Sequence, residues 1–371
     1  MDLRYLTPLA YPSRFVNRLQ VMKMSESFSR LAEKFTLYVR ELRAPIKEIF
    51  GDYDVRNEFN VLALGKPHFW PKSLFFARRV SIIIKHNPDT VWFLRDGLLA
   101  FWLSYFLNIR SNMFFFEVHA FERLPSFVYR RVFGVARGII TTNKKKADDL
   151  TKIFGVPKDK IIVALNGVDL NFKSNLSREE ARKRLSLPMD EKLIIYIGTP
   201  SEEKGILTLL KLAQLLPPEI KIISVGGRGN EIANFKSNEN FRKIIWVEQV
   251  SHQKAGEYMS AADMLLAPFS GKSNWTSLYT SPLKIPEYLL MAKPIVISNL
   301  PSIREFVSDN EVFFFEADNA HSLLDVINGA FANPQIMLEK ARRAATKAKD
   351  FSWEGRAKVI YDFMLEKSKQ S

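Results

Sequence analysis

Apolar runs of strand length recur along the whole chain and alternate with segments of helix length, and this pattern limits the fold more than any other feature. In the first half the runs are LRYLTPLA (3–10), FTLYVR (35–40), FNVLALG (59–65), TVWFLR (90–95), MFFFEVHA (113–120), GIITTN (138–143) and IIVALNG (161–167). In the second half they are KLIIYIG (192–198), IKIISVGG (220–227), KIIWVE (243–248), MLLAPF (264–269), PIVISN (294–299) and VFFFEA (312–317). Continuous apolar strands between helices are typical of parallel sheets covered on both faces.

Two such series in tandem predict an α/β protein with two Rossmann-like domains that face each other across a cleft. A chain of 371 residues is long enough for two domains. A turn signal at Asn166 and a helix cap at Ser177 place the boundary between a first domain, 1–168, and a second domain, 169–352. The final amphipathic helix, about 353–371, is expected to pack back on the first domain.

The net charge of +14 is concentrated in the first domain. Through Val168 there are 27 Lys and Arg against 15 Asp and Glu, whereas the remainder has 27 against 25. A strongly basic face suits nucleic acid, an anionic membrane or a phosphorylated substrate. Charge alone does not choose among these partners.

Three further features concern the compartment. The chain has no cysteine, which excludes disulfides, thiolate metal ligands and a cysteine nucleophile. The start, MDLRYLTPLA, lacks the basic flank and apolar core of a secretory signal. The longest apolar run, 97–109, is shorter than the roughly 20 residues that span a bilayer. We therefore expect a cytoplasmic protein without a transmembrane helix.

Polar residues follow strand ends in the second domain, where an open parallel sheet binds its ligands. Gly198 and Thr199 lead to Lys204 at a helix start, where amide dipoles and a lysine charge together suit a diphosphate. After the next strand, Gly227 allows close backbone approach and Arg228 can pair with phosphate. Taken alone, each signal is explained equally well by a solvated side chain or an ordinary turn.

The third strand-end segment is YTSPLKIPEYLL, 279–290. Ser281 can act as an N-cap with Pro282 at the first helical position. In the first turns, Lys284 can reach a phosphate, and Glu287 can accept hydrogen bonds from paired ribose hydroxyls. The alternative is a capped helix with a solvated ion pair.

The stretch TSPLKIPEYLLMAKPIVISNLPSIREFV resembles the signature segment of GT-B glycosyltransferases of the family 4 type, the glycosyl transferases group 1. YIGTPSEEKG resembles that family's donor-phosphate segment, and NGVD resembles its interdomain junction. AADMLLAPF and FSWE also fit, so the resemblance covers most of 160–365. In the first half it rests on strand order and on FEVHAF, 116–121. It implies a hexosyltransferase that uses a UDP- or GDP-linked sugar.

The resemblance also implies residue roles. Glu287 matches the glutamate that holds the ribose hydroxyls, and Lys204 matches the lysine that neutralises the donor diphosphate. Main-chain contacts are implied for Ser281, Pro282 and Leu283. His119 matches a histidine that faces the transferred sugar, and its ordinary alternative is a satisfied core histidine. Retention of anomeric configuration is implied as well.

The chain departs from the family pattern at several positions. Tyr279 stands where the first of two glutamates, eight residues apart, is usual, so the identity of the sugar is open. Thr199 stands in place of a common arginine, and Arg228 is expected to supply part of that charge. Pro286 removes an amide beside Glu287 and should start or kink the helix. The loop AYPSRFVNR lacks the glycines common after the first strand.

The residues that stabilise the leaving diphosphate define the expected mechanism. The sequence has no His/Asp cluster with metal-ligand spacing. We therefore predict a transferase without metal or cofactor, in which Lys204, Arg228 and helix amides stabilise the leaving group.

Two basic, aromatic-rich segments, 66–86 and 121–133, raise the question of a membrane. Helices of this composition can lie in an anionic interface, although an amphipathic helix packed on its own sheet explains them too. We expect a peripheral enzyme on the inner membrane face, with a lipid-linked or polysaccharide acceptor.

Other functions stay open at this point. An epimerase or phosphorylase of similar fold lacks its expected residues, and a glycoside hydrolase would need paired carboxylates, which Glu117 and Glu122 do not clearly form. A nucleic-acid-binding protein would explain the charge, but no recognised motif supports it. A degenerate transferase that binds nucleotide without turnover fits Tyr279 and Pro286.

Overall fold

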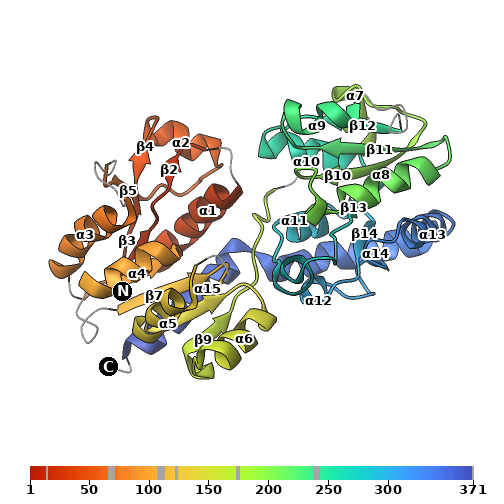
Figure 1. The fold of residues 1–371 in the computed structure, drawn as a ribbon. Helices are drawn as coiled ribbons and strands as arrows, with labels where there is room; N and C mark the ends of the chain where they lie inside the picture. The colour runs from red at the N-terminus through yellow and green to blue at the C-terminus, as the bar shows by residue number, and fades with distance from the viewer. Residues whose placement is uncertain are drawn as a thin grey trace. The chain divides into compact units, whose positions relative to one another are not determined.

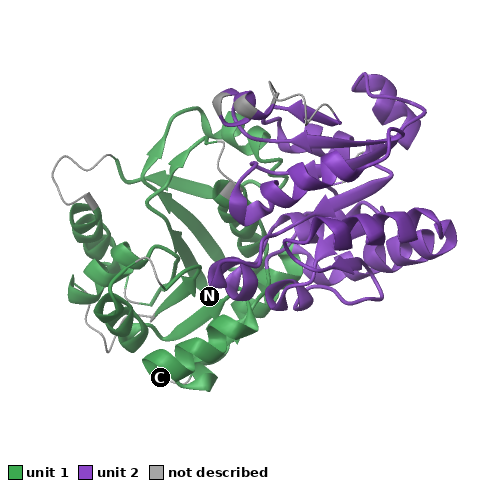
Figure 2. Cartoon of the chain, turned by 45° about the vertical axis from the view of Figure 1, so that its right-hand side comes forward, with its two compact units in different colours: residues 1–165, 353–371 green, residues 166–352 purple. Residues whose placement is uncertain are grey.

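The computed structural model describes residues 1–13, 16–65, 72–87, 89–106, 113–121, 124–172, 176–236 and 243–369. The chain forms two compact units (Figure 2). Unit 1 consists of Met1–Leu165 together with Trp353–Ser371, and unit 2 is Asn166–Ser352. The division follows Leu165, three residues before the boundary expected from the sequence.

Unit 1 is built on a seven-stranded parallel sheet in the order β5-β3-β1-β6-β7-β8-β9 (Figure 1). Its strands are β1 (Asp2–Leu6), β3 (Lys34–Val39), β5 (Asn60–Ala63), β6 (Val91–Leu94), β7 (Met113–Val118), β8 (Gly138–Thr141) and β9 (Ile161–Val163). Its helices are α1 (Val16–Leu31), α2 (Ile46–Asp52), α3 (Lys72–Lys85), α4 (Gly97–Phe106), α5 (Ser126–Val135), α6 (Lys144–Phe154) and α15 (Trp353–Lys369). Successive strands run outward from β1 to β5 and then return to β6, so the order reverses between β1 and β6.

The C-terminal helix α15 packs within unit 1, against α1 and β8. The ring of Phe363 lies 6.0 Å from that of Phe115, centroid to centroid. A Cβ added at Gly138 would lie 2.6 Å from the Phe363 ring, so a glycine at the start of β8 permits this close approach.

The first apolar run is divided in the structure. β1 ends at Leu6, and after Pro8 the chain forms β2 (Ala10–Tyr11), which pairs with β4 (Glu41–Leu42) in a separate two-stranded sheet. Proline has no N–H to donate to a strand ladder, which explains why one strand does not continue through 3–10. The sequence did not predict this small sheet.

Unit 2 is built on a six-stranded parallel sheet in the order β12-β11-β10-β13-β14-β15. Its strands are β10 (Lys192–Ile197), β11 (Ile220–Val225), β12 (Ile244–Val247), β13 (Met264–Ala267), β14 (Ile295–Ser298) and β15 (Phe313–Phe315). Its helices are α7 (Arg178–Arg184), α8 (Ile206–Leu215), α9 (Gly229–Lys236), α10 (His252–Ala261), α11 (Lys284–Leu290), α12 (Pro301–Arg304), α13 (Ala320–Phe331) and α14 (Pro334–Lys347). Here the strand order reverses between β10 and β13.

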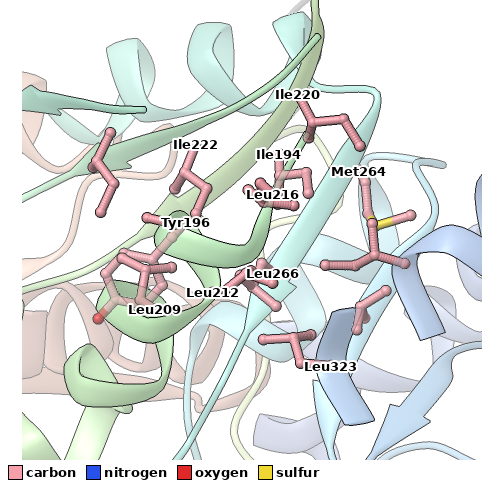
Figure 3. Packing of buried hydrophobic residues seen from close by; sticks show 14 of the residues in the cluster. Ile194, Tyr196, Leu209, Leu212, Leu216, Ile220, Ile222, Met264, Leu266 and Leu323 are labelled. Carbon is pink, nitrogen blue, oxygen red and sulfur yellow. The ribbon is translucent and has the colours of Figure 1, made fainter. Parts of the chain in front are cut away.

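Buried apolar side chains join the unit 2 sheet to its helices (Figure 3). Ile194, Ile222 and Met264 from three strands pack with Leu209 of α8 and Leu323 of α13. Every apolar run that the sequence predicted as a strand contains one, in parallel sheets of two units. The predicted α/β fold class is therefore confirmed.

Candidate functional site

Glycines shape the carboxyl ends of β10 and β11 in unit 2. Gly198 has a φ of 145°, Gly226 of 127° and Gly227 of 85°, conformations that favour glycine. A Cβ added at Gly226 would lie only 2.6 Å from the carbonyl oxygen of Gly198. The two strand ends therefore touch through their backbones.

Lys204 is held by a tight turn that follows β10. It ends a 3₁₀ helix, Glu202–Lys204, and Gly205 with φ of 78° links that turn to α8. A Cβ at Gly205 would lie 1.5 Å from the carbonyl oxygen of Pro268, just after β13. The Nζ atom of Lys204 lies 5.2 Å from the centroid of the Phe269 ring. The glycine thus brings Lys204 against the end of β13, the strand next to β10.

Lys284, the first residue of α11, meets Lys204 at the same ring. Its Nζ lies 5.1 Å from the Phe269 centroid and 4.3 Å from the Tyr196 centroid. This buried Nζ has no hydrogen-bond partner within the described part of the chain. Burial, together with the Lys204 charge, holds the pKa of Lys284 well below its usual range, and burial lowers the pKa of Lys204. The two amines disfavour each other's charge, and a bound anion would favour the charged form of both.

Glu287 lies in the first turn of α11 and meets a residue that the sequence did not single out. His252 Nε2 lies 2.8 Å from Glu287 Oε1. The His252 ring stacks on Phe172, with centroids 3.9 Å apart and an interplanar angle of 10°. His252 begins α10 directly after the N-cap Ser251, whose side chain accepts from Lys254 N. In the sequence, His252 could have been recognised as a polar residue at a helix start that follows the end of strand β12.

The prediction that Ser281 caps the signature helix is wrong. α11 begins at Lys284, its N-cap position is Leu283, and no side chain caps it. The Ser281 carbonyl instead accepts a hydrogen bond from Asn166 Nδ2 at 2.6 Å, which keeps Ser281 and Pro282 outside the helix. Pro286 is the third helical residue, where the missing N–H removes no intrahelical bond.

The other residues predicted for unit 2 include Arg228, Thr199 and Tyr279, and each makes different contacts. Arg228 is exposed, its backbone N donates to Glu231 Oε2 at 2.6 Å, and no described contact brings its guanidinium to the two lysines. The Thr199 carbonyl accepts from Tyr196 Oη at 3.0 Å. Tyr279 is buried at the end of a π-helical turn, Trp275–Tyr279. Among the described contacts, Lys284 rather than Arg228 therefore supplies the second cation beside Lys204.

His119 lies in unit 1, directly after β7. Its Nε2 is 3.2 Å from Glu117 Oε1, and Arg356 Nη2 of α15 donates to the same oxygen at 2.6 Å. Burial would raise the pKa of Glu117, but Arg356 and His119 hold it well below its usual range. The His119 side chain is 30% exposed, yet burial of the ring and the Arg95 charge lower its pKa to about 4. His119 is thus a neutral imidazole beside a carboxylate, while Glu122 lies outside the described residues.

Within the described ranges, no three His, Asp or Glu side chains are grouped as ligands for a metal ion. In the same ranges, no helix has the length and apolar character needed to cross a membrane.

Two units, each built on a parallel sheet covered by helices, place the chain in the GT-B fold class. Residues 177–351 match the family model Glycosyl transferases group 1, so the resemblance found in the sequence is confirmed. That segment covers almost all of unit 2, so the match to this family lies in unit 2.

Individual relatives agree with this classification. The chain is 21% identical over 254 residues to the D-inositol 3-phosphate glycosyltransferase of Xylanimonas cellulosilytica, covering 65% of this chain and 59% of that protein. The chain spans about half the length of the curated relatives it matches. Among solved structures, a glycosyltransferase from Rickettsia africae has a TM-score of 0.78 at 16% identity, covering 100% of both chains. HepE (Alr3699) of Anabaena in complex with UDP-glucose also has a TM-score of 0.78, at 14% identity, covering 99% of this chain and 100% of that one.

Proposed function

We propose that the chain is a glycosyltransferase that moves a hexose-type sugar from a nucleotide-sugar donor to a lipid-linked or polysaccharide acceptor. The observation that carries this proposal is the pair Lys204 and Lys284, which share the Phe269 ring at the β10/β13 reversal. In open α/β sheets, ligands bind outside the carboxyl ends of the strands at such a reversal. The positive charges of the two lysines would match the negative charges of a diphosphate.

The donor's nucleoside would lie on the Glu287 side of this cation pair. Glu287 lies one helical turn beyond Lys284, close enough that its charge raises the pKa of that lysine against the effect of burial. Its carboxylate would accept hydrogen bonds from ribose hydroxyls, and His252 would orient it through Oε1. A UDP-linked donor is favoured because HepE, which has this fold, was solved with UDP-glucose.

Transfer breaks the bond between the sugar C1 and the diphosphate oxygen, so negative charge grows on the leaving group. Lys204 and Lys284 would stabilise that charge in a site shielded from water, an effect that typically contributes a few kcal/mol per group. We propose that these fixed cations replace a metal ion, and that the configuration at C1 is retained, as the family resemblance implies. Because Glu117 favours the proton on Nε2, His119 would offer Nδ1 to a hydroxyl of the transferred sugar.

Binding of the donor can be tested by thermal shift with UDP, GDP, ADP and their hexose conjugates, with EDTA and without. We expect one nucleotide to raise the unfolding temperature with EDTA present, and the shift to vanish in Lys204→Met. Radiolabelled sugar from the same donor should then reach a membrane or polysaccharide fraction. The absence of a shift with every nucleotide would leave a protein of this fold without donor binding.

A peripheral membrane location is also proposed for unit 1. Its helices α4 and α5 expose Leu98, Tyr105 (56%) and Phe127 (61%), and the last two flank the ring of Phe101 at 5.2 and 5.9 Å. Apolar side chains beside basic residues are typical of surfaces that lie in an anionic interface.

Neighbouring basic residues supply the charge for this surface. α3, which packs on α4, exposes Arg78 and Arg79 beside Ile82. Flotation should therefore recover the protein with phosphatidylglycerol vesicles and not with phosphatidylcholine vesicles. Phe127→Ser should weaken this recovery, and Val359→Ser, at an exposed position of α15, should not. Equal recovery with both vesicle types would contradict the electrostatic part of the proposal.

A further inference from the structure

A cavity lies in unit 2 beside the amino ends of the neighbouring strands β13 and β14. The start of α7, the end of α10 and the loop from α11 to β14 enclose it. Its volume is about 220 Å³, far more than the roughly 30 Å³ that one water molecule occupies in the liquid. Its polar lining consists of Ser177, Arg178, Ser260 and Lys293, and none of its described lining residues is acidic.

Asp263, the acid whose charge acts most strongly on Lys293, is already used by other groups. Its Oδ1 accepts from Arg178 Nη1 at 2.5 Å. Its Oδ2 accepts from Arg182 Nη2 at 2.6 Å and from Leu193 N at 2.7 Å. Both carboxylate oxygens are therefore occupied, and neither bonds the lysine.

Lys293 is the cation of this group without a bonded acid. Its side chain is half-buried and makes no hydrogen bond or ion pair with any residue that the structure describes. Burial lowers the pKa of Lys293, Asp263 raises it in part, and Arg178 and Arg182 lower it further. Since Glu179 bonds Arg178 at 2.9 Å, two acids stand against three cations. An anion in the cavity would supply the missing negative charge.

Hydroxyl groups complete the lining with further donors. Ser260 is only 4% exposed, and within the described ranges its hydroxyl has no hydrogen-bond partner. Ser177 Oγ accepts from Glu180 N at 3.2 Å, which leaves its hydroxyl hydrogen available. Each polar side chain of the lining can thus donate, and a buried hydroxyl without a partner is uncommon in folded proteins. Such a set of donors suits an oxyanion.

We propose that this cavity binds inorganic phosphate or a phosphate monoester, with Lys293 and Arg178 as its cations and Ser260 as a further donor. Leu290 and Met291 also line the cavity and would contact the organic part of a monoester. The site is separate from the donor site, which lies beyond the carboxyl ends of the same sheet.

Two helices connect this cavity to the donor site. α10 begins with His252 and carries Ser260 near its end, while α11 begins with Lys284 and ends at Leu290, about 10 Å away. At their amino ends the two helices meet through His252 and Glu287. An anion that fixes their other ends would therefore act on Glu287. This effector role rests on the proposed function, whereas the binding of phosphate does not.

Calorimetric titration of the full chain with inorganic phosphate tests the site. The starting protein is Lys204→Met, because it removes a cation of the donor site. We expect a dissociation constant on the order of 0.1–1 mM, as a few charge-assisted hydrogen bonds would give. Adding Lys293→Met should weaken binding by at least about tenfold, and Lys293→Arg should keep part of it. Lys183→Met, which removes an exposed charge of α7 outside the cavity, should change nothing.

The unfolding temperature separates a lost site from a lost fold. Lys293→Met should unfold at the temperature of its parent or above, because it removes a half-buried amine. Equal phosphate binding with and without Lys293→Met would overturn the proposal. Glucose 6-phosphate that binds at least as tightly as phosphate, by way of Lys293, would assign the cavity to a monoester. Much weaker binding of glucose 6-phosphate would assign it to the free ion.

UDP titrations at increasing phosphate concentration test the effector role. Phosphate also competes with UDP at the donor site, and Lys293→Met reports this competition alone. We expect the phosphate dependence of UDP affinity to differ between wild type and Lys293→Met by at least about fivefold. The same dependence in both would refute the effector role. A chain that binds phosphate through Lys293 but binds no nucleotide would contradict the donor site and not the cavity.

Discussion

Arg356 and Glu117, 239 residues apart in the sequence, form a buried ion pair of 2.6 Å. One lies in the C-terminal helix α15 and the other at the end of β7, next to His119. Both side chains are almost completely inaccessible to solvent, at 2% and 0%. The final helix therefore supplies the counter-ion of the carboxylate that His119 contacts.

Breaking this pair should destabilise unit 1 strongly. Arg356→Met leaves Glu117 buried without its main counter-ion, which typically costs about 3–5 kcal/mol. Hydrogen exchange of β7 peptides in increasing urea measures the free energy of unfolding of this unit. Lys358→Met, which removes an exposed pair with Asp362 on the same helix, should cost less than about 0.5 kcal/mol. A loss of similar size in both variants would show that the buried pair adds nothing.

Lys284 should lower the stability of the nucleotide-free protein, although it contributes to the binding of a nucleoside diphosphate. Its amine is buried against Tyr196 and Phe269 and has no hydrogen-bond partner among the described residues, so Lys284→Met should raise the free energy of unfolding by about 1–3 kcal/mol in the absence of nucleotide. The same change should weaken nucleoside diphosphate binding by at least about tenfold. Thermal unfolding and calorimetry measure the two effects. Lys211→Met, on the exposed face of α8, is the matched control, and a destabilised Lys284→Met would contradict this account.

Nucleotide binding should take up protons. Burial and Lys204 hold the pKa of Lys284 below its usual range in the free protein, and a bound diphosphate would raise it. Between the pKa of the free protein and that of the complex, binding therefore adds protons and affinity falls as the pH rises. Calorimetry over a range of pH, in buffers of different ionisation enthalpy, counts the protons. The uptake should shrink in Lys284→Met, and proton release in wild type would refute the assignment.

The sequence predicted the sheets much better than it predicted the contacts of the site. A long apolar run must be buried on both faces in any parallel sheet, so the positions of the strands can be read from the sequence itself. The helix start at Ser281 was predicted wrongly because its carbonyl is held by Asn166, more than 100 residues away. His252 was missed, and Lys284 was not recognised as the partner of Lys204, since both depend on residues brought together only by the fold.

Glu287 should distinguish a nucleoside from a bare diphosphate. If it accepts hydrogen bonds from ribose hydroxyls, Glu287→Gln weakens UDP binding by about 10- to 100-fold and changes pyrophosphate binding much less. His252→Ala removes the group at 2.8 Å that orients the carboxylate and should give a smaller loss in the same direction. Competition titration with both ligands makes the comparison. Equal losses for UDP and pyrophosphate would place Glu287 at the phosphates or in the fold.

A substitution at Gly205 tests whether its contact with Pro268 fixes the position of Lys204. Both the backbone conformation of Gly205 and its packing exclude a side chain. Its φ of 78° disfavours other residues, and an added Cβ would lie 1.5 Å from the Pro268 carbonyl oxygen. Gly155 has a similar φ of 70° but open space around it, so Gly155→Ala should cost only about 1 kcal/mol of backbone strain. Gly205→Ala should cost clearly more and also weaken UDP binding, since Lys204 must move with its turn. Equal stability losses in the two variants would mean that the turn can shift away from Pro268, and Lys204 would then not be fixed by this contact.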